Sequence, residues 1–119
     1  MKKVLLVEDD LFLIDIYKKK LKNSGFEVLT AETGTKAIKM AKEKNPDLIL
    51  LDVVLPEMEG WAVLKQFKKD KVTSKVIVLS NLGQKAEVEK GLALGAEKYL
   101  IKAQHTPTEV IEEIKKINL

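Results

Sequence analysis

Five short stretches of consecutive apolar residues divide the chain at regular intervals. Consecutive apolar positions are typical of strands covered on both faces, because neither side of such a strand meets water. The stretches are Lys3–Val7, Phe26–Ala31, Asp47–Asp52, Lys75–Leu79 and Lys98–Ile101. We therefore predict five buried strands.

Each predicted strand is followed by a segment that suits a helix. Apolar residues three and four apart share one helix face and can cover a sheet. In four of these segments, such positions are Leu13, Ile14, Tyr17 and Leu21; Ala37, Ile38 and Ala41; Val63, Leu64 and Phe67; and Val110, Ile111, Ile114 and Ile117. The remaining helix, which follows the fourth strand, is predicted over residues 84–94. Alternating strands and helices predict an α/β fold, a doubly wound five-stranded parallel sheet flanked by five helices. The length suits one core, so residues 1–119 are expected to form one domain.

Turn and capping signals bound these helices. Asn23-Ser24-Gly25 suits the end of the first helix, and Asn45-Pro46 closes the second. The run Thr106-Pro107-Thr108-Glu109 combines a capping box with proline at the first helical position. It is the clearest helix start in the chain.

Polar side chains follow four of the five predicted strands. Glu8 and Asp9 come after the first strand, Asp52 ends the third, Ser80 follows the fourth and Lys102 follows the fifth. Any one of them could be an ordinary turn residue. In open parallel sheets, however, ligands bind beyond the carboxyl ends of the strands, so the joint pattern predicts a site at that edge.

The residue types at this edge favour phosphoryl transfer. Three neighbouring carboxylates repel one another unless a cation compensates them, and Mg²⁺ takes oxygen ligands while leaving positions for a phosphate. Lys102 could pair with a carboxylate at rest and with a phosphoryl oxygen afterwards, and Ser80 could donate to another oxygen. A carboxylate nucleophile beside Mg²⁺, an ammonium and a hydroxyl suits this chemistry.

Composition narrows the choice of partners and compartment. All 21 basic residues are lysine, against 18 acidic ones, for a net charge of +3. Without arginine, which reads guanine edges and clamps phosphates, we expect no direct nucleic-acid binding. The longest mostly apolar stretch, Leu48–Leu55, is far below the roughly 18 residues of a membrane span, so no membrane insertion is expected. The chain has no cysteine and no secretory signal, which favours the cytoplasm.

Five motifs together resemble the receiver domains of bacterial two-component response regulators, the single-domain chemotaxis regulators among them. They are VLLVEDD at 4–10, PDLILLD at 46–52, LPEMEG at 55–60, VLS at 78–80 and GAEKYLIK at 95–102. The resemblance covers essentially the whole chain. It implies the strand order 2-1-3-4-5, which periodicity alone does not give.

The resemblance also implies roles for the site residues. Asp52 would accept a phosphoryl group from a histidine kinase or histidine phosphotransfer protein, making the chain a signalling domain that promotes its own phosphorylation and dephosphorylation. Mg²⁺ would be held by Asp9, Asp52 and the Val54 backbone carbonyl, with Glu8 supporting it through water. Lys102 and Ser80 would bind the remaining phosphoryl oxygens.

A switch is implied as well. Movement of Ser80 toward the phosphoryl group would let Tyr99 turn inward, changing the surface of the fourth helix, fifth strand and fifth helix for a downstream target or output domain. This would shift a pre-existing equilibrium. From the residues alone, Tyr99 is equally an ordinary half-buried strand aromatic.

Two features depart from the family pattern. Ala103 stands where the family usually has a proline after the lysine, joined by a cis bond, so we expect either a trans peptide with a reshaped loop or local strain. Val54 and Leu82 are apolar where many members carry polar groups that guide water. We expect them to lengthen the phosphoryl lifetime.

Other functions fit the residues less well. A haloacid dehalogenase type of phosphatase needs its nucleophile and acid two residues apart after the first strand, and flavin binding needs a glycine- and hydroxyl-rich loop there, unlike Glu8-Asp9-Asp10. The stronger rival is a receiver-like interaction module that is not phosphorylated. His105 is given no role, and Trp61 is expected to pack in its helix near the site.

Overall fold

Residues 1–119 form alternating strands and helices in the computed structural model of the protein, and all of them are described. The strands are β1 (Lys3–Val7), β2 (Glu27–Ala31), β3 (Leu48–Leu51), β4 (Lys75–Ser80) and β5 (Lys98–Ile101). The helices are α1 (Leu11–Asn23), α2 (Gly34–Lys44), α3 (Gly60–Lys69), α4 (Lys85–Ala93) and α5 (Pro107–Lys115), with a short 3₁₀ helix at Lys102–Gln104.

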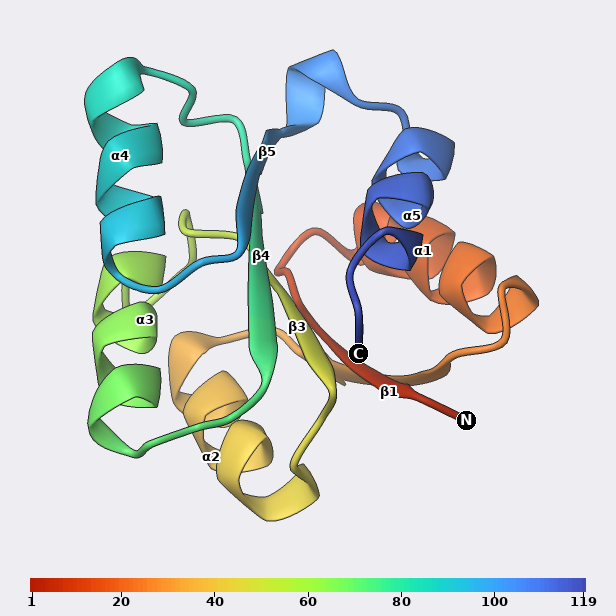
Figure 1. The fold of residues 1–119 in the computed structure, drawn as a ribbon, viewed down its shortest axis with the longest axis horizontal. Coiled ribbons are helices and arrows are strands. Elements are labelled where there is room, and N and C mark those ends of the chain that lie inside the picture. The colour runs from red at the N-terminus through yellow and green to blue at the C-terminus, as the bar shows by residue number, and fades with distance from the viewer.

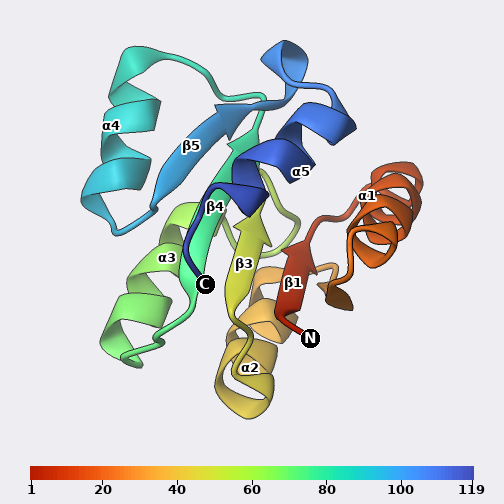
Figure 2. The same cartoon turned by 45° about the vertical axis from the view of Figure 1, so that its right-hand side comes forward.

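The strands form one parallel sheet in the order β2-β1-β3-β4-β5. This confirms the expected fold class and the strand order implied by the family. The sheet runs through the centre of the molecule, with α1 and α5 on one face and α2, α3 and α4 on the other (Figure 1). The turned view shows β1, β3, β4 and β5 side by side (Figure 2).

Both faces of the sheet are buried because successive side chains of each strand point to opposite sides. In β1, Leu5 and Val7 join the core beneath α2 and α3, whereas Val4 and Leu6 join the core beneath α1 and α5. Leu48–Leu51 is entirely buried and divides in the same way. Consecutive apolar positions therefore serve two cores at once.

Element boundaries differ from expectation by a residue or two, for local hydrogen-bonding reasons. Phe26 precedes β2, because its amide donates to the Leu21 carbonyl at the end of α1. Asp47 and Asp52 flank β3, and β4 extends to Ser80. Ile117, expected in the last helix, lies after α5 in a turn closed by its amide and the Ile114 carbonyl, yet packs on the same core.

The helix starts follow the sequence signals. Thr106 and Glu109 form the expected capping box, with Pro107 in the first turn of α5. Asp10 caps α1 by accepting hydrogen bonds from the amides of Phe12 and Leu13. None of the helices combines the length and hydrophobicity that crossing a bilayer requires.

Candidate functional site

Four strand ends meet at one edge of the sheet. The register pairs Val7 with Leu51, Leu51 with Val78, and Ser80 with Ile101, so the residues that follow these strands are neighbours in space. The residues that line the resulting open cavity of about 340 Å³ are Glu8, Asp9, Asp10, Leu13, Asp52, Val54, Ser80, Asn81 and Lys102.

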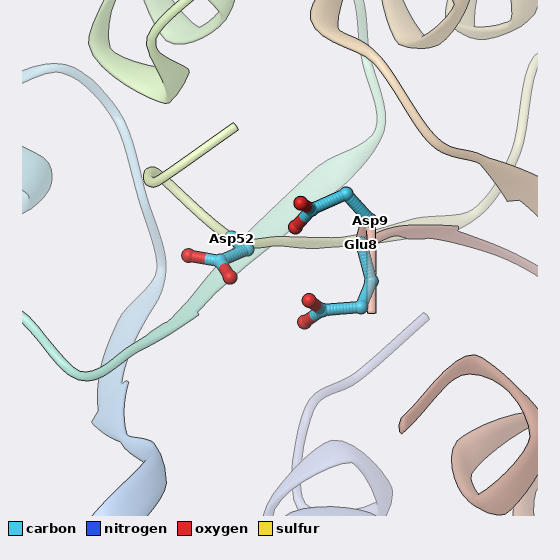
Figure 3. A group of neighbouring side chains, drawn as sticks. All are labelled: Glu8, Asp9 and Asp52. Atoms are coloured by element: carbon cyan, nitrogen blue, oxygen red, sulfur yellow. The ribbon is translucent and has the colours of Figure 1, made fainter. Parts of the chain in front are cut away.

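Glu8, Asp9 and Asp52 form an acidic cluster in this cavity. One carboxylate oxygen from each lies within 4.8 Å of the others. The side chains of Glu8 and Asp9, which follow β1, extend toward Asp52, which follows β3 (Figure 3). Glu8 and Asp52 are buried and Asp9 is exposed, so the cluster has a closed floor and an open side. An all-oxygen donor set of this charge suits a hard divalent cation.

Lys102 reaches the cluster from the end of β5. Its Nζ donates to Glu8 Oε2 and to Asp52 Oδ2, each at 2.7 Å. Its side chain is only 14% exposed, so these ion pairs are poorly screened by water. Ala103 follows this lysine where the family usually has proline, yet the Lys102 side chain still reaches both carboxylates.

Burial and charge shift two of these groups. Burial is the largest effect on the pKa of Glu8 and raises it, while the Lys102 hydrogen bond opposes the rise and the charge of Asp52 adds to it. Burial alone would lower the pKa of Lys102, but its hydrogen bonds to Asp52 and Glu8, together with the negative charges of these two groups, outweigh burial and raise it. Lys102 is therefore a fixed cation beside the carboxylates.

The Asp52 carboxylate is held in place by the backbone after it. Oδ1 accepts a hydrogen bond of 2.9 Å from the Val54 amide. The Gly60 amide donates to the Val53 carbonyl at 2.9 Å, and a Cβ on Gly60 would lie 2.3 Å from Val53 Cα. Only glycine permits this close approach, which joins the start of α3 to the turn after Asp52.

Ser80 links the cavity to Tyr99. Ser80 is fully buried, and its Oγ accepts a hydrogen bond of 3.3 Å from the Leu82 amide. The Tyr99 hydroxyl donates to the Leu82 carbonyl, and its ring stacks on Trp61 with centroids 6.4 Å apart. Burial is the main cause of the raised Tyr99 pKa, so this hydroxyl stays protonated near neutral pH.

The structure brings the expected site residues together, with Tyr99 just outside the cavity. Every peptide bond is trans, which confirms the expected trans peptide at Ala103, and residues 102–104 form the 3₁₀ helix. Sequence reasoning missed Asn81 as a lining residue and Asp10 as a helix cap. Both are polar residues within three positions of a strand end, the same signal that identified Ser80 and Asp9.

Comparisons with known proteins agree with this geometry. The model of the response regulator receiver domain family matches residues 4–115. The chain is 36% identical over 116 residues to the alkaline phosphatase synthesis transcriptional regulatory protein PhoP of Bacillus subtilis, a match that covers 98% of this chain and 48% of that protein. It is 33% identical over 118 residues to the chemotaxis protein CheY of Thermotoga maritima, covering 98% of each.

Solved structures share the fold. The CheY-like response regulator receiver domain protein of Methanospirillum hungatei has a TM-score of 0.90 at 29% identity, covering 98% of this chain and 92% of that one. The chain spans about half the length of the Bacillus PhoP relative but nearly all of the Thermotoga CheY. Because the family match extends over almost the entire chain, and the sheet and its helices are those of the solved relatives, the protein belongs to the response regulator receiver domain family.

Proposed function

We propose that Asp52 is the phosphoryl acceptor of this receiver domain. The observation that carries the proposal is the placement of its carboxylate, buried at the floor of the cavity and bonded to the ammonium of Lys102 at 2.7 Å. In the transfer, an Asp52 carboxylate oxygen forms a bond to phosphorus while the bond from phosphorus to the donor's histidine nitrogen breaks. The histidine leaves with the electrons of that bond and can take a proton from water.

Asp9 and Asp52 would hold Mg²⁺, together with the Val54 carbonyl that the family pattern adds, and Glu8 would support the ion through water. Their fit rests on three carboxylate oxygens within 4.8 Å at an open cavity. Mg²⁺, when bound, supplies positive charge that offsets the negative charge on the transferred group. Glu8 also bonds Lys102 and the Asp10 amide, so it orients the lysine and the turn toward α1.

Lys102 and Ser80 would bind the phosphoryl oxygens once Asp52 is modified. Lys102 already lies at the carboxylate, so it needs only to exchange Asp52 Oδ2 for a phosphoryl oxygen. The Ser80 hydroxyl can give up its hydrogen bond from the Leu82 amide and donate a hydrogen bond to a phosphoryl oxygen. Because Tyr99 bonds the carbonyl of the same Leu82, movement at Ser80 would reach Tyr99 and the α4-β5-α5 surface.

The partners follow from this chemistry. The phosphoryl donor would be a histidine kinase or a histidine phosphotransfer protein. The partner that responds to the phosphorylated chain would be a downstream target or output domain that binds the α4-β5-α5 surface. Water attack on the modified Asp52 would then return the chain to its starting state. The domain would promote both steps of its own cycle.

Incubation with Mg²⁺ and a small acyl phosphate tests the proposal. We expect the intact chain to gain the mass of one phosphoryl group, located at Asp52 by borohydride reduction and peptide mapping. Asp52→Asn should gain none. Asp15→Asn, an exposed aspartate of α1 paired with Lys19, makes the same charge change away from the cavity and should be modified like the wild type.

The rival is a receiver-like interaction module without phosphorylation. It predicts no mass gain in the wild type under the same conditions, even at saturating Mg²⁺ and donor. A gain that persists in Asp52→Asn would instead place the acceptor at another residue.

A further inference from the structure

The Tyr99 ring lies against two helices, α3 and α4, on the same face of the sheet. Its ring stacks on Trp61 of α3, with an angle of 22° between the ring planes. The Nζ of Lys90 of α4 lies 4.9 Å from the Trp61 ring centroid, within the range of a cation–π contact. We refer to Trp61, Lys90, Gly91 and Tyr99 as the aromatic clamp.

Gly91 has no backbone reason to be glycine. It lies inside α4 (Lys85–Ala93) and has no positive φ, and an interior helical glycine costs about 0.5 to 1 kcal/mol relative to alanine. Space is the remaining reason. A Cβ at this position would lie 2.7 Å from Tyr99 Cδ2, closer than real Cβ contacts, and 3.0 Å from Cε2, so the ring would have to shift. Gly91 thus leaves the slot that the Tyr99 ring fills.

The clamp is connected to the proposed acceptor site by a short path. The Tyr99 hydroxyl donates to the Leu82 carbonyl, and the Leu82 amide donates to Ser80 Oγ. Ser80 lines the cavity with Asp52. The position of the Tyr99 ring therefore depends on Ser80 at one end and on Trp61 and Gly91 at the other.

We infer that Trp61 and Gly91 are positioning residues that hold the Tyr99 ring at Leu82, so that α3 as well as α4 responds to the state of Asp52. The clamp itself is a property of the structure, and its response to phosphorylation rests on the proposed function. Closing the slot with a methyl group should expel the ring. Trp61 should then lose its stacking partner and become more exposed.

Trp61 is the only tryptophan in the chain, so its fluorescence reports the clamp directly. We would measure acrylamide quenching of Trp61 in the unphosphorylated wild type, Gly91→Ala, Tyr99→Ala and the double variant. Each single variant should raise the quenching constant about twofold or more. The double variant should match Tyr99→Ala, because a methyl group cannot expel a ring that is absent.

Leu92→Ala is the matched control, since Leu92 is the neighbouring exposed residue of α4 and lies outside the clamp. It should quench like the wild type. Circular dichroism and thermal unfolding would verify that every variant is folded. If Gly91→Ala quenches like the wild type, or if its effect adds to that of Tyr99→Ala, the inference is overturned.

A second measurement separates this inference from the proposed function. With Mg²⁺ and the acyl phosphate, the mass gain at Asp52 should be equal in the wild type and Gly91→Ala, whereas Trp61 quenching should change only in the wild type. Failure of the mass gain in both would reject the proposed acceptor while the unphosphorylated measurements still decide the clamp. A mass gain with an equal change of quenching in both proteins would reject the coupling through Gly91.

Discussion

Val54 gives the cavity an apolar side chain, and Leu82 lies just outside the cavity next to Ser80 and Tyr99. Val54 lines the cavity and is 55% exposed, and Leu82 is partly buried against the core beside Tyr99. Neither side chain can accept a proton from water or orient it by a hydrogen bond. Water that enters beside a phosphorylated Asp52 would therefore lack a side-chain guide from these two positions.

Polar replacements at both positions should shorten the phosphoryl lifetime. We expect the Val54→Asn, Leu82→Glu double variant to lose phosphate about tenfold faster than the wild type, a difference of about 1.4 kcal/mol in barrier height. Phosphate release after removal of the donor measures the rate. Val54→Ala, which reduces bulk without adding polarity, serves as the control. A wild type that loses phosphate as fast as the double variant would contradict the role of these side chains.

We expect Lys102 to have opposite effects on Mg²⁺ binding and on phosphoryl transfer. Its ammonium occupies Glu8 Oε2 and Asp52 Oδ2, so it competes with a divalent cation for the same carboxylates. Lys102→Gln should therefore bind Mg²⁺ more tightly in a calorimetric titration, yet accept phosphate about a hundredfold more slowly, because a fixed charge on the transferred group is lost.

Lys85→Gln provides the comparison for Lys102→Gln, since Lys85 belongs to an exposed pair with Glu89 on α4. It should leave both Mg²⁺ affinity and transfer rate as in the wild type. Weaker Mg²⁺ binding in Lys102→Gln would mean that the lysine supports the metal site and does not compete with it.

Residue types and strand ends were enough to identify the candidate site, but not the part that each acidic residue takes. Glu8, Asp9 and Asp10 are adjacent in sequence, yet Glu8 is buried under Lys102, Asp9 faces the open side and Asp10 caps α1. The path of the chain between β1 and α1 determines which way each of these three side chains points. Hydrophobic periodicity carries no information about that direction.

At the scale of elements, β5 and α5 are tied by Glu113. Its carboxylate accepts hydrogen bonds from Lys116 at 2.7 Å and from Lys98 of β5 at 3.0 Å. The bond from Lys116 is the largest cause, and the bond from Lys98 the second, of a pKa lowered to about 2. A carboxyl group with a lowered pKa in the folded state stabilises the fold above its unfolded pKa of about 4.5, and this stability is lost as the pH falls toward 2.

Glu113→Gln should therefore be less stable than the wild type at pH 6, and the difference should shrink between pH 4.5 and pH 2. Urea unfolding midpoints across this range measure it. Glu112→Gln makes the same change at an exposed neighbour on the same helix and should show a smaller difference. A gap for Glu113→Gln that stays constant with pH would show that packing, and not ionisation, makes the contribution.

Sequence patterns located all of the main elements because the central strands β1, β3 and β4 are buried almost throughout, and turn or capping signals mark the helices. The edge strands β2 and β5 are only partly buried, but they too consist mainly of apolar residues. The 3₁₀ helix at Lys102–Gln104 was not foreseen as a helix, although a reshaped loop was. The chain turns directly after Ile101, and the His105 ring and the Ile101 carbonyl lie at hydrogen-bonding distance, 3.1 Å apart. That contact joins residues on either side of the turn and leaves no periodic signal.

At the scale of the whole molecule, the arrangement of the strands turns separate sequence signals into one site. The alternation of strands and helices along the chain predicted a parallel sheet. The order β2-β1-β3-β4-β5 came from the family resemblance, because local patterns do not specify which strands are neighbours. The order matters for function. It places β1 beside β3, so that Asp9 and Asp52 meet although more than forty residues separate them.

Because those carboxylates come together only in the folded chain, a cation bound between them should stabilise the fold. A ligand that binds only the folded state at a hundred times its dissociation constant contributes about 2.7 kcal/mol, which corresponds to a rise of about 10 °C in the unfolding temperature of a domain of this size. Thermal unfolding in Mg²⁺, compared with a chelator at equal ionic strength, measures the effect. Asp9→Asn should remove most of it and Asp15→Asn should retain it, since Asp15 pairs with Lys19 outside the cavity. Equal Mg²⁺ stabilisation of both variants would point to general screening of charge in place of a site built by the sheet.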